Sequence, residues 1–325
     1  GSISLVGSTA NYFPNNNWNG TDTFTYKAND GTDDSNISTA TITVVPVNDA
    51  PVTQNQSVST NEDTAVALTL SVVDVDNVQG MTRSIVSNPS NGSVVLSGSG
   101  NQTATYTPNT NWNGTDTFTW KANDGTDDSN TSTVTITVAA VNDTPTVNES
   151  SPVTLNEDSN VDVTLSGTDV DGDTITFSVV TNPSNGSVAL SGTNNQVATY
   201  TPTANYNGSD SFIYKANDGT VDSDSATIFY TVTAVNDAPI VNNITVSTNE
   251  NRMMQLNITL DGTDVDGDNL TYQIVNSVSN GTLTDPSAGN TVTYTPGTNF
   301  NGTDTFTYKA NDGTVDSNTA TATIT

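Results

Sequence analysis

A repeat of 94 residues constrains this chain more than any other feature. The phrase Asn-Asp-Gly-Thr occurs four times at intervals of 94 residues, ending at Thr32, Thr126, Thr220 and Thr314. The phrase Val-Asn-Asp-(Ala/Thr)-Pro has the same spacing and begins at Val47, Val141 and Val235. This period is longer than that of solenoid repeats and fits a small β-sandwich domain. The sequence therefore predicts a tandem array of whole domains.

The two phrases divide the chain into one partial and three full repeats. Residues 1–46 align with the second half of a repeat, because Gly1-Ser2-Ile3-Ser4-Leu5 matches Gly92-Ser93-Val94-Val95-Leu96. The full repeats are predicted at residues 47–140, 141–234 and 235–325. We expect residues 1–46 alone not to close a two-sheet core, and we interpret the chain as a piece of a longer one.

Hydrophobic and polar residues alternate within each repeat, which is typical of strands with one buried face. Along residues 116–122, Phe118, Trp120 and Ala122 share one face, and the residues between them are Thr or Lys. The alternation recurs in the other repeats, and no segment has helical periodicity. With about seven short strands per repeat, the predicted fold is all-β, a tandem array of Ig-like Greek-key β-sandwiches.

Two local features of each repeat have predicted roles in the sandwich. An Asn-Gly pair between strand-like runs predicts a tight hairpin with positive φ. The pairs are Asn91-Gly92, Asn185-Gly186 and Asn280-Gly281. An aromatic residue before the main aromatic strand is predicted to pack at the edge of the core rather than to form a sugar-binding platform. These residues are Trp18, Trp112, Tyr206 and Phe300.

Composition excludes several classes of function. The chain has 6 basic and 35 acidic residues, a formal net charge of −29, and neither histidine nor cysteine. So few basic residues cannot neutralise the phosphates of a nucleic-acid partner. The usual zinc, haem and thiol sites and Ser-His-Asp catalysis lack their essential residues. No apolar stretch is long enough to span a membrane, so we expect no membrane insertion in this segment.

The carboxylates gather at four places in a repeat. They are an early acidic residue (Glu62, Glu157, Glu250), an Asp-x-Asp stretch (Asp74 and Asp76, Asp169 and Asp171, Asp264 and Asp266), the linker (Asp49, Asp143, Asp237) and the end of the aromatic strand (Asp30, Asp124, Asp218, Asp312). Strand-end loops and the incoming linker meet at one pole of a sandwich, so we expect three of these groups to converge. Two carboxylates about 5 Å apart repel by about 3 kcal/mol at an effective dielectric of about 20, which favours protonation or a bound cation. Oxygen ligands without histidine or cysteine favour calcium.

The spacing excludes an EF-hand, which the Asp-x-Asp-Gly-Asp stretch superficially resembles. An EF-hand loop has Gly at position six and a bidentate Glu at position twelve. Here Gly172 is at position four counted from Asp169, and position twelve is Val180. The equivalent residue of the next repeat is Val275.

The same motifs resemble the cadherin repeat. Asp169-Val170-Asp171-Gly172-Asp173 before a strand resembles its paired-Asp segment, and Ala216-Asn217-Asp218-Gly219 with Val235-Asn236-Asp237-Ala238-Pro239 resembles its closing half. Asn61-Glu62-Asp63 and Glu250-Asn251 are similar to its early Glu-Asn pair. The resemblance covers all the repeats and is to bacterial cadherin-like tandem repeats of large secreted or surface adhesins. It implies cadherin-like sandwiches with calcium bound between successive repeats.

Carried over position by position, the resemblance implies one set of calcium ligands at each joint. The joint at 47–51 would use Asn48, Asp49, Asp74, Asp76 and Asp124. The joint at 141–145 would use Glu62, Asn142, Asp143, Asp169, Asp171 and Asp218. The joint at 235–239 would use Glu157, Asn236, Asp237, Asp264, Asp266 and Asp312.

The chain also departs from the cadherin pattern. The cadherin linker has another Asp two places before its Asn, where this chain has Pro46, Ala140 and Ala234, and the mid-domain Asp-Arg-Glu motif is not recognisable. Fewer ligands imply one or two ions per joint and weaker binding, with Asp173 and Asp268 as additional donors. The alternative interpretation is that these Asp and Asn residues only shape turns and solubilise loops.

These features predict a non-catalytic, calcium-stiffened spacer of a bacterial adhesin, located outside the cell or at its surface. Its first partners are the neighbouring repeats of the same chain. One alternative is that the repeats themselves bind glycans, cell surfaces or other copies, and associate laterally into a fibre. A second is an isopeptide crosslink at the equivalent lysines, which the alternation places on the polar face: Lys27, Lys121, Lys215 and Lys309. A carboxylate-pair glycosidase repeated in every domain is disfavoured.

Overall fold

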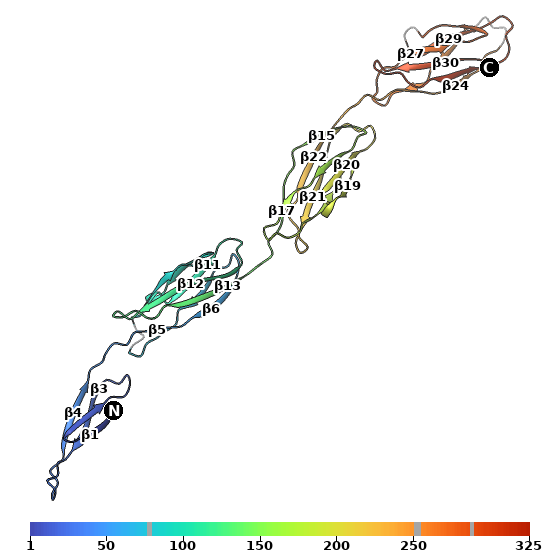
Figure 1. Cartoon of the computed structure of the whole chain (residues 1–325). Helices are drawn as coiled ribbons and strands as arrows, with labels where there is room; N and C mark the ends of the chain where they lie inside the picture. Colours follow the sequence, from blue (N-terminus) through green and yellow to red (C-terminus); the bar gives the residue numbers. More distant parts are fainter. Residues whose placement is uncertain (77–79, 250–254, 287–288) are drawn as a thin grey trace. The chain divides into compact units, whose positions relative to one another are not determined.

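The computed structural model describes residues 1–76, 80–249, 255–286 and 289–325, and these residues are almost entirely β-structure (Figure 1). The chain divides into two compact units, Gly1–Asp143 and Thr144–Thr325. Two short 3₁₀ turns interrupt the strands, η1 (Ser99–Asn101) and η2 (Thr193–Asn195). The predicted all-β fold is confirmed.

The partial repeat at the start of unit 1 forms two antiparallel hairpins, β1–β2 and β3–β4. The strands are β1 (Ser2–Val6), β2 (Thr9–Phe13), β3 (Gly20–Tyr26) and β4 (Ser38–Val44). None of residues 1–46 is buried, and Leu5 is 72% exposed. As expected, this segment has no closed two-sheet core.

The complete sandwich of unit 1 follows the partial repeat. Its strands are β5 (Val52–Thr53), β6 (Gln56–Asn61), β7 (Val66–Thr69), β8 (Val72–Val73), β9 (Thr82–Ser87), β10 (Gly92–Ser97), β11 (Thr103–Pro108), β12 (Gly114–Asn123) and β13 (Ser132–Ala139). One sheet has the order β6-β13-β12-β9, and the other has the order β10-β11-β7. β6 and β13 are parallel, whereas the other pairs are antiparallel. The short pair β5–β8 lies outside these two sheets.

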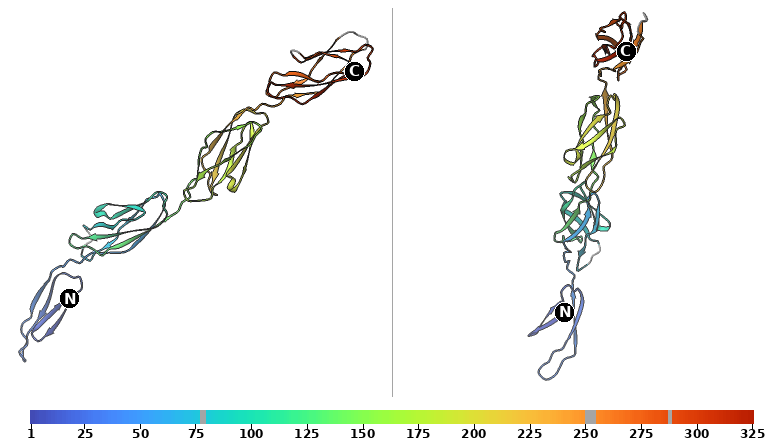
Figure 2. Two further views of the ribbon diagram at one scale, coloured as in Figure 1. Left: turned by 45° about the horizontal axis from the view of Figure 1, so that its top comes forward. Right: turned by 90° about the vertical axis from the view of Figure 1, so that its right-hand side faces the viewer.

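Unit 2 contains two sandwiches with the same topology. The strands of the first are β14 (Thr146–Val147), β15 (Val153–Asn156), β16 (Val161–Thr164), β17 (Gly167–Thr168), β18 (Thr176–Thr181), β19 (Gly186–Ser191), β20 (Val197–Pro202), β21 (Gly208–Asn217) and β22 (Ala226–Thr233). Those of the second are β23 (Ile240–Val241), β24 (Ile244–Val246), β25 (Leu256–Thr259), β26 (Gly262–Thr263), β27 (Thr271–Asn276), β28 (Gly281–Leu283), β29 (Thr291–Pro296), β30 (Asp304–Asn311) and β31 (Ala320–Ile324). Their sheet orders are β15-β22-β21-β18 with β16-β20-β19, and β24-β31-β30-β27 with β25-β29-β28. Two further views show the paired sheets (Figure 2).

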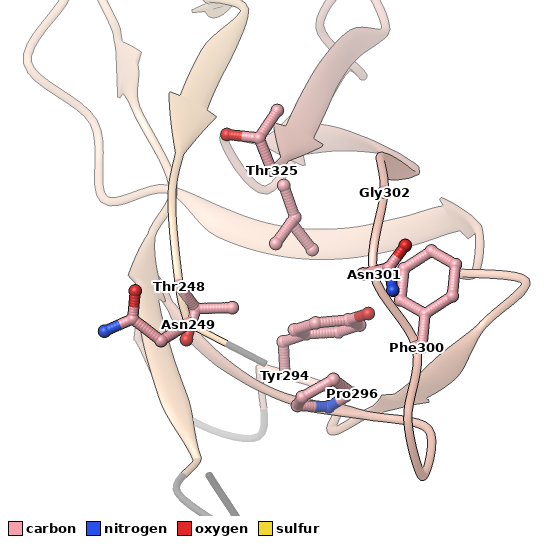
Figure 3. A pocket seen from close by; sticks show the side chains of 9 residues that line it. Thr248, Asn249, Tyr294, Pro296, Phe300, Asn301, Gly302 and Thr325 are labelled. Carbon is pink, nitrogen blue, oxygen red and sulfur yellow. The ribbon is translucent and has the colours of Figure 1, made fainter. Parts of the chain in front are cut away.

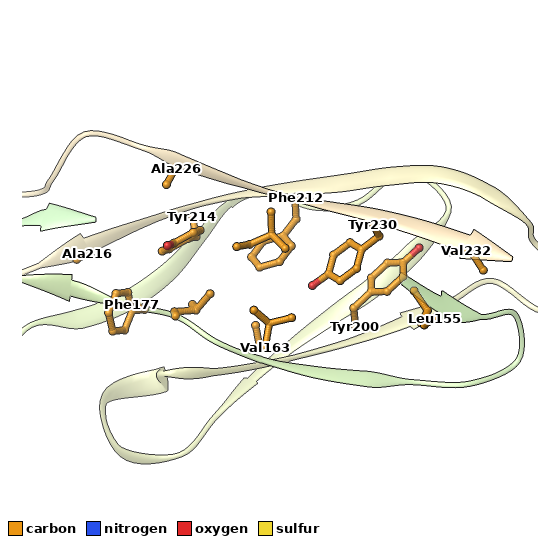
Figure 4. Close-up of a cluster of buried hydrophobic side chains, with 13 residues drawn as sticks. Leu155, Val163, Phe177, Tyr200, Phe212, Tyr214, Ala216, Ala226, Tyr230 and Val232 are labelled. Carbon is orange, nitrogen blue, oxygen red and sulfur yellow. The ribbon is translucent and has the colours of Figure 1, made fainter. Parts of the chain in front are cut away.

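Each complete sandwich has its own aromatic core. In the first sandwich of unit 2, the Tyr200 and Tyr230 rings stack with centroids 4.0 Å apart, and Phe212 lies beside Tyr230 (Figure 4). In unit 1, Phe118 and Trp120 are completely buried, as the alternation predicted. Burial of each such side chain stabilises its sandwich by about 2–3 kcal/mol. The three complete sandwiches are therefore each stabilised by a small core of their own, and the chain has no single large core among its described residues.

The Asn-Gly pairs do not form the predicted hairpins. Gly92 lacks positive φ, opens β10 and pairs with Pro108. A Cβ at Gly92 would lie 2.5 Å from the Thr107 carbonyl oxygen and 2.6 Å from the Tyr106 ring. The glycine is therefore required for space, and Gly186 and Gly281 have the same surroundings. The turn between β10 and β11 lies instead at η1, which Gly98 precedes with a φ of 81°.

Candidate metal centre

The aspartate after each aromatic strand shapes a turn. Asp124 Oδ1 accepts the backbone N–H groups of Thr126 and Asp127 at 2.7 and 2.8 Å. The Asp127 N–H, the Asn48 side chain and the Thr126 N–H together hold the pKa of Asp124 below its usual value. The equivalent turn in the partial repeat lowers the pKa of Asp30 to about 2, chiefly through the Asp33 and Thr32 N–H groups. The turn-shaping role therefore applies to one oxygen of these carboxylates.

The linker asparagine attaches to the second oxygen of the same aspartate. Asn48 Nδ2 donates to Asp124 Oδ2 at 2.9 Å, and Asn236 Nδ2 donates to Asp312 Oδ2 at 2.8 Å. The Asp312 pKa lies far below its usual value because of this bond and the turn N–H groups. The strand-end turn and the linker thus meet at the same pole of the sandwich.

The Asp-x-Asp stretch joins this pole through the next linker residue. The Asp49 N–H donates to Asp76 Oδ2 at 2.7 Å, and Asp76 in turn donates its N–H to Asp74 Oδ1 at 2.7 Å. In unit 2 the Asp237 N–H donates to Asp266 Oδ2, also at 2.7 Å. At 47–51 and 235–239, the structure brings together the linker, the Asp-x-Asp stretch and the strand-end turn.

The longer Asp-x-Asp-Gly-Asp stretches concentrate three carboxylates. Asp264 Oδ1 accepts the N–H groups of Asp266 and Asp268 at 3.0 and 3.2 Å. One oxygen from each of these three carboxylates lies within 4.8 Å of the others, and Asp169, Asp171 and Asp173 form the same cluster. Asp173 and Asp268 therefore lie beside the predicted ligands, and their role as additional donors stays a prediction. The turn needs Gly267, whose φ is 83°.

Two of the early glutamates, Glu62 and Glu157, are buried at the opposite pole of their sandwiches, where the chain enters the next linker. Glu157 is 3% exposed, and its Oε1 accepts the Val235 N–H at 2.6 Å. Glu62 is also 3% exposed, and its Oε1 accepts the Val141 N–H at 2.6 Å. Several buried carboxylate oxygens have no hydrogen-bond partner among the described residues: Glu62 Oε2, Glu157 Oε2, Asp169 Oδ2, Asp237 Oδ2 and Asp264 Oδ2. A buried anionic oxygen without a partner is costly unless a cation binds it.

Asp237 lies close enough to several other carboxylates of the 235–239 joint for their charges to affect it. Burial raises its pKa, and the charges of Asp158, Asp266, Glu157 and Asp264 raise it further. Asp158 was not among the predicted ligands. It follows the early glutamate directly, has a φ of 57°, and its Oδ1 accepts the Asn205 N–H at 3.0 Å. The sequence feature that could have identified Asp158 is the Asn-Glu-Asp triplet, which occurs at both 61–63 and 156–158.

The residues predicted for the joint at 141–145 belong to both compact units. In unit 1, Asn142 Nδ2 donates to the Asp143 carbonyl oxygen at 2.9 Å. In unit 2, Asp169 Oδ1 accepts the Asp171 N–H at 2.9 Å, and Asp218 Oδ1 accepts the Thr220 N–H at 2.6 Å. This ligand set as a whole stays a prediction. Glu250 lies outside the described residues.

The lysines and the edge aromatics have structural contacts. Lys215 and Lys309 lie 2.5 Å from Asp222 and Asp316 in partly exposed ion pairs, on the polar face that the alternation predicted. The other two pairs are Lys27 with Asp34 and Lys121 with Asp128. Trp112 and Tyr206 pack against the cores of their sandwiches, as predicted for edge residues.

A pocket of about 200 Å³ lies at one end of the last sandwich (Figure 3). Tyr294, Pro296 and Phe300 line it together with Thr248 and Thr325. None of its described lining residues has a charged side chain. The Tyr294 hydroxyl already donates a hydrogen bond to Asp304 at 3.2 Å.

Among the described residues, no helix is long and apolar enough to cross a membrane.

The repeated two-sheet sandwich with acidic joints defines a set of tandem Ig-like repeats of cadherin-like architecture. The chain belongs to the bacterial Ig domain family, which matches residues 1–44, 48–137, 142–231 and 236–325. Ig-like repeat domains of this family are typically structural. The domain boundaries predicted from the sequence stay predictions.

Solved structures of cadherin fragments are similar in fold to this chain. The chain is similar to the EC22–24 fragment of mouse cadherin-23, with a TM-score of 0.51, 17% identity, and coverage of 86% of this chain and 98% of that one. It is also similar to protocadherin gammaB7 EC3–6, with a TM-score of 0.52, 16% identity, and coverage of 85% and 74%. At these identities the likeness shows the fold. A curated relative, integrin beta-like protein A of Dictyostelium discoideum, is 26% identical over 353 residues, covering 90% of this chain; the chain spans 18% of that relative's length.

Proposed function

We propose that this chain is a non-catalytic spacer of an adhesion protein, located outside the cell or at its surface, whose joints are held by calcium. The observation that carries the proposal is the group of buried carboxylate oxygens without partners at the 235–239 joint, on Glu157, Asp237 and Asp264. Negative charges held close together and partly removed from water are unfavourable without a counter-ion. A cation among them relieves this cost.

Calcium fits this donor set better than other ions. The candidate ligands are carboxylate and amide oxygens, and the chain has no histidine or cysteine. Calcium accepts six to eight oxygens in irregular geometry, whereas magnesium requires near-octahedral geometry and retains water. Asn236, Asp266 and Asp312 supply further oxygens near Asp237. Extracellular modules typically bind calcium with Kd of about 10⁻⁴–10⁻³ M, which suits occupancy outside a cell.

The mechanical consequence follows from where the ligands lie in the sequence. Glu157 is in the sandwich before the linker, Asp237 is in the linker, and Asp264 is in the sandwich after it. An ion shared by these three residues restrains the linker. Without an ion, the same carboxylates repel one another and the linker is free to move. The calcium-bound array is therefore stiff, and the calcium-free array is flexible.

Thermal unfolding in chelator and across a calcium titration tests the proposal. With a Kd of about 10⁻⁴ M, a calcium concentration one hundred times higher stabilises the folded state by about 2.7 kcal/mol. Glu157→Gln is expected to remove most of this increment at its joint. Asp162→Asn is the matched control, since Asp162 is an exposed residue of β16 bonded to Thr199. An equal calcium response in both variants, or none in the wild type, would contradict the proposal.

Small-angle scattering tests the stiffening separately. The distribution of molecular dimensions is expected to narrow on addition of calcium and to broaden in chelator. If the scattering is identical in both conditions while calcium still raises the unfolding temperature, calcium stabilises the fold but does not stiffen the array, and the spacer role of calcium is contradicted.

A further inference from the structure

The partial repeat has two sheet edges whose equivalents are covered in the complete repeats. Its sheets are the hairpins β1–β2 and β3–β4, each with two strands (Figure 1). In the sequence, β2 and β4 begin 94 residues before β11 and β13. In the complete sandwich of unit 1, β7 pairs with β11 and β6 pairs with β13. Among the described residues, no strand occupies the equivalent edges of β2 and β4.

The apolar face beside these edges is open. Trp120 and Ile136 of the complete sandwich are fully buried. Their equivalents 94 residues earlier are Tyr26, which is 55% exposed, and Ile42, which is half-buried. Strand addition at this face therefore also buries apolar surface, which is favourable.

In the complete repeats, the turn between the two covering strands makes two specific hydrogen bonds. The turn between β6 and β7 carries the Asn-Glu-Asp triplet at 61–63. Glu62 Oε1 accepts the Val141 N–H at 2.6 Å, and Asp63 Oδ1 accepts the Asn111 N–H at 3.0 Å. The next repeat has both bonds between the equivalent residues. Two carboxylates of one turn thus bind one N–H group in a loop and one in the linker.

The partial repeat presents the same two N–H groups. They belong to Asn17 and Val47, and neither has a hydrogen-bond partner among the described residues. Asn17 has a φ of 57° and its equivalent Asn111 has a φ of 54°, so the loop already has the conformation that receives the turn. A pocket of about 350 Å³ lies here, and Asn17, Trp18 and Val47 are among its lining residues.

The acidic surroundings of this pocket do not exclude carboxylates. Asp49 also lines the pocket. Its equivalent in unit 2, Asp237, lies close enough to Glu157 and Asp158 for their charges to affect it. A complete repeat therefore already holds this combination of charges beside the linker.

We propose that residues 1–46 and the linker after them dock a strand–turn–strand segment of another polypeptide with Asn-Glu-Asp at its turn. The pattern of the segment is that of residues 56–69, which contain β6, the turn and β7. Its first strand adds to β4 in parallel and its second strand adds to β2 in antiparallel orientation, as β6 and β7 do. The glutamate of the turn accepts the Val47 N–H, and the aspartate accepts the Asn17 N–H. The added strands contribute affinity through main-chain hydrogen bonds, and the turn contributes specificity.

The complete sandwiches do not offer the same surface. Their outer strands belong to sheets whose apolar faces are already buried in closed cores. A folded second copy is not the occupant, because its own segments of this pattern are already paired within its sandwiches.

A synthetic peptide with the sequence of residues 56–69 tests the proposal. The labelled peptide is titrated with the intact chain and followed by fluorescence anisotropy, in calcium and again in chelator, so that the outcome does not depend on ion binding at the joints. Saturable one-to-one binding is expected in at least one of the two buffers. The same peptide with Glu62→Gln and Asp63→Asn is expected to bind at least about tenfold more weakly, because hydrogen bonds to a neutral amide oxygen are weaker than those to a carboxylate.

Two matched variants of the chain locate the docked peptide. Ile42 lies on the face to be covered, since its equivalent Ile136 is fully buried opposite Val58 of β6. Ile42→Lys is therefore expected to weaken binding at least about tenfold, because the docked segment would remove the charge from water. Thr43→Lys makes the same charge change at the next, exposed position. It is expected to bind the peptide within about twofold of the wild type.

Three results would overturn the proposal: no saturable binding in either buffer, equal binding of the two peptides, or the same affinity in both lysine variants. Insertion of the peptide into a complete sandwich gives the third result. If Ile42→Lys unfolds the β3–β4 hairpin, the comparison of the two peptides decides, because it is made on the unaltered chain.

Discussion

The Tyr106 hydroxyl donates a 3.0 Å hydrogen bond to Oδ2 of Asp116, a carboxylate that is only 5% exposed. Asp116 also accepts the N–H groups of Ser90, Asn91 and Thr117 at 3.0, 2.8 and 2.8 Å. The buried charge is therefore fully hydrogen-bonded, and it ties the loop before β10 to the start of β12. The arrangement recurs in the pairs Tyr12–Asp22, Tyr200–Asp210 and Tyr294–Asp304.

Asp116→Asn is expected to lower the free energy of unfolding of its sandwich by about 2–4 kcal/mol. The amide turns its NH₂ group toward N–H donors and leaves buried groups unpaired. Tyr106→Phe removes one hydrogen bond and is expected to cost about 1 kcal/mol. Urea unfolding followed by tryptophan fluorescence measures both, since Trp112 and Trp120 lie in this sandwich. Equal effects of the two changes would contradict a central role for the carboxylate.

The same carboxylate gives the sandwich an acid-sensitive stability. Burial raises the pKa of Asp116, but the hydrogen bonds from Asn91, Ser90, Thr117 and Tyr106 outweigh burial, and the pKa lies below its usual value. A lowered folded-state pKa stabilises the fold above the unfolded value of about 3.9 and loses that contribution as pH falls further. Unfolding free energy should therefore decrease below about pH 4, with a shallower decrease in Asp116→Asn. An unchanged slope in the variant would assign the acid sensitivity to other groups.

Much of this fold could be predicted because two periods coincide in the sequence. The 94-residue repeat predicted a tandem array of sandwiches, and the two-residue alternation around Phe118 and Trp120 predicted which strand face is buried. The convergence of the linker with the Asp-x-Asp stretch could also be predicted, since both lie at strand ends. Local pattern and topology agree at these positions.

Other features depend on contacts that the local pattern does not contain. Glu157 is buried against the linker, where it accepts the N–H of Val235, a residue 78 positions further along the chain. A local sequence pattern does not show such a contact. The proximity of Asp158 to Asp237 likewise depends on how the linker passes the preceding sandwich. The Asn91-Gly92 pair was misassigned because a glycine needed for space and one needed for positive φ give the same sequence signal.

Gly92 offers a test of that distinction. Gly92→Ala is expected to destabilise the sandwich by about 1–3 kcal/mol, because the new Cβ overlaps the Thr107 carbonyl oxygen. Gly92→Asn should be worse than alanine, whereas a hairpin glycine with positive φ tolerates asparagine well. Ser93→Ala, at the next and exposed position, is the control and should be nearly neutral. Thermal unfolding of the three variants gives the order, and an asparagine variant more stable than the alanine variant would restore the hairpin interpretation.

Lys121→Met is expected to change stability by less than about 1 kcal/mol. Lys121 and Asp128 form a partly exposed ion pair, with side chains 37% and 48% exposed, and water and salt screen such pairs strongly. The intact mass of the wild-type chain is expected to equal the sequence mass, because the lysine faces a solvated carboxylate rather than a buried asparagine. A mass lower by one ammonia or one water per repeat, together with a large loss of stability in the variant, would establish a crosslink.

Asp237→Asn is expected to have opposite effects with and without calcium. Burial and the charges of Asp158, Asp266, Glu157 and Asp264 raise the pKa of Asp237, so its ionised form destabilises the metal-free fold at neutral pH. This destabilisation diminishes as pH falls through the raised pKa, and the neutral amide abolishes it. In chelator the variant should therefore unfold at a higher temperature than the wild type. In calcium the order should reverse, since loss of one charged ligand is expected to weaken binding about tenfold or more. The exposed Asp224→Asn, the same charge change outside the joint, should show no reversal; if Asp237→Asn also shows none, the carboxylates at this joint do not act together on one ion.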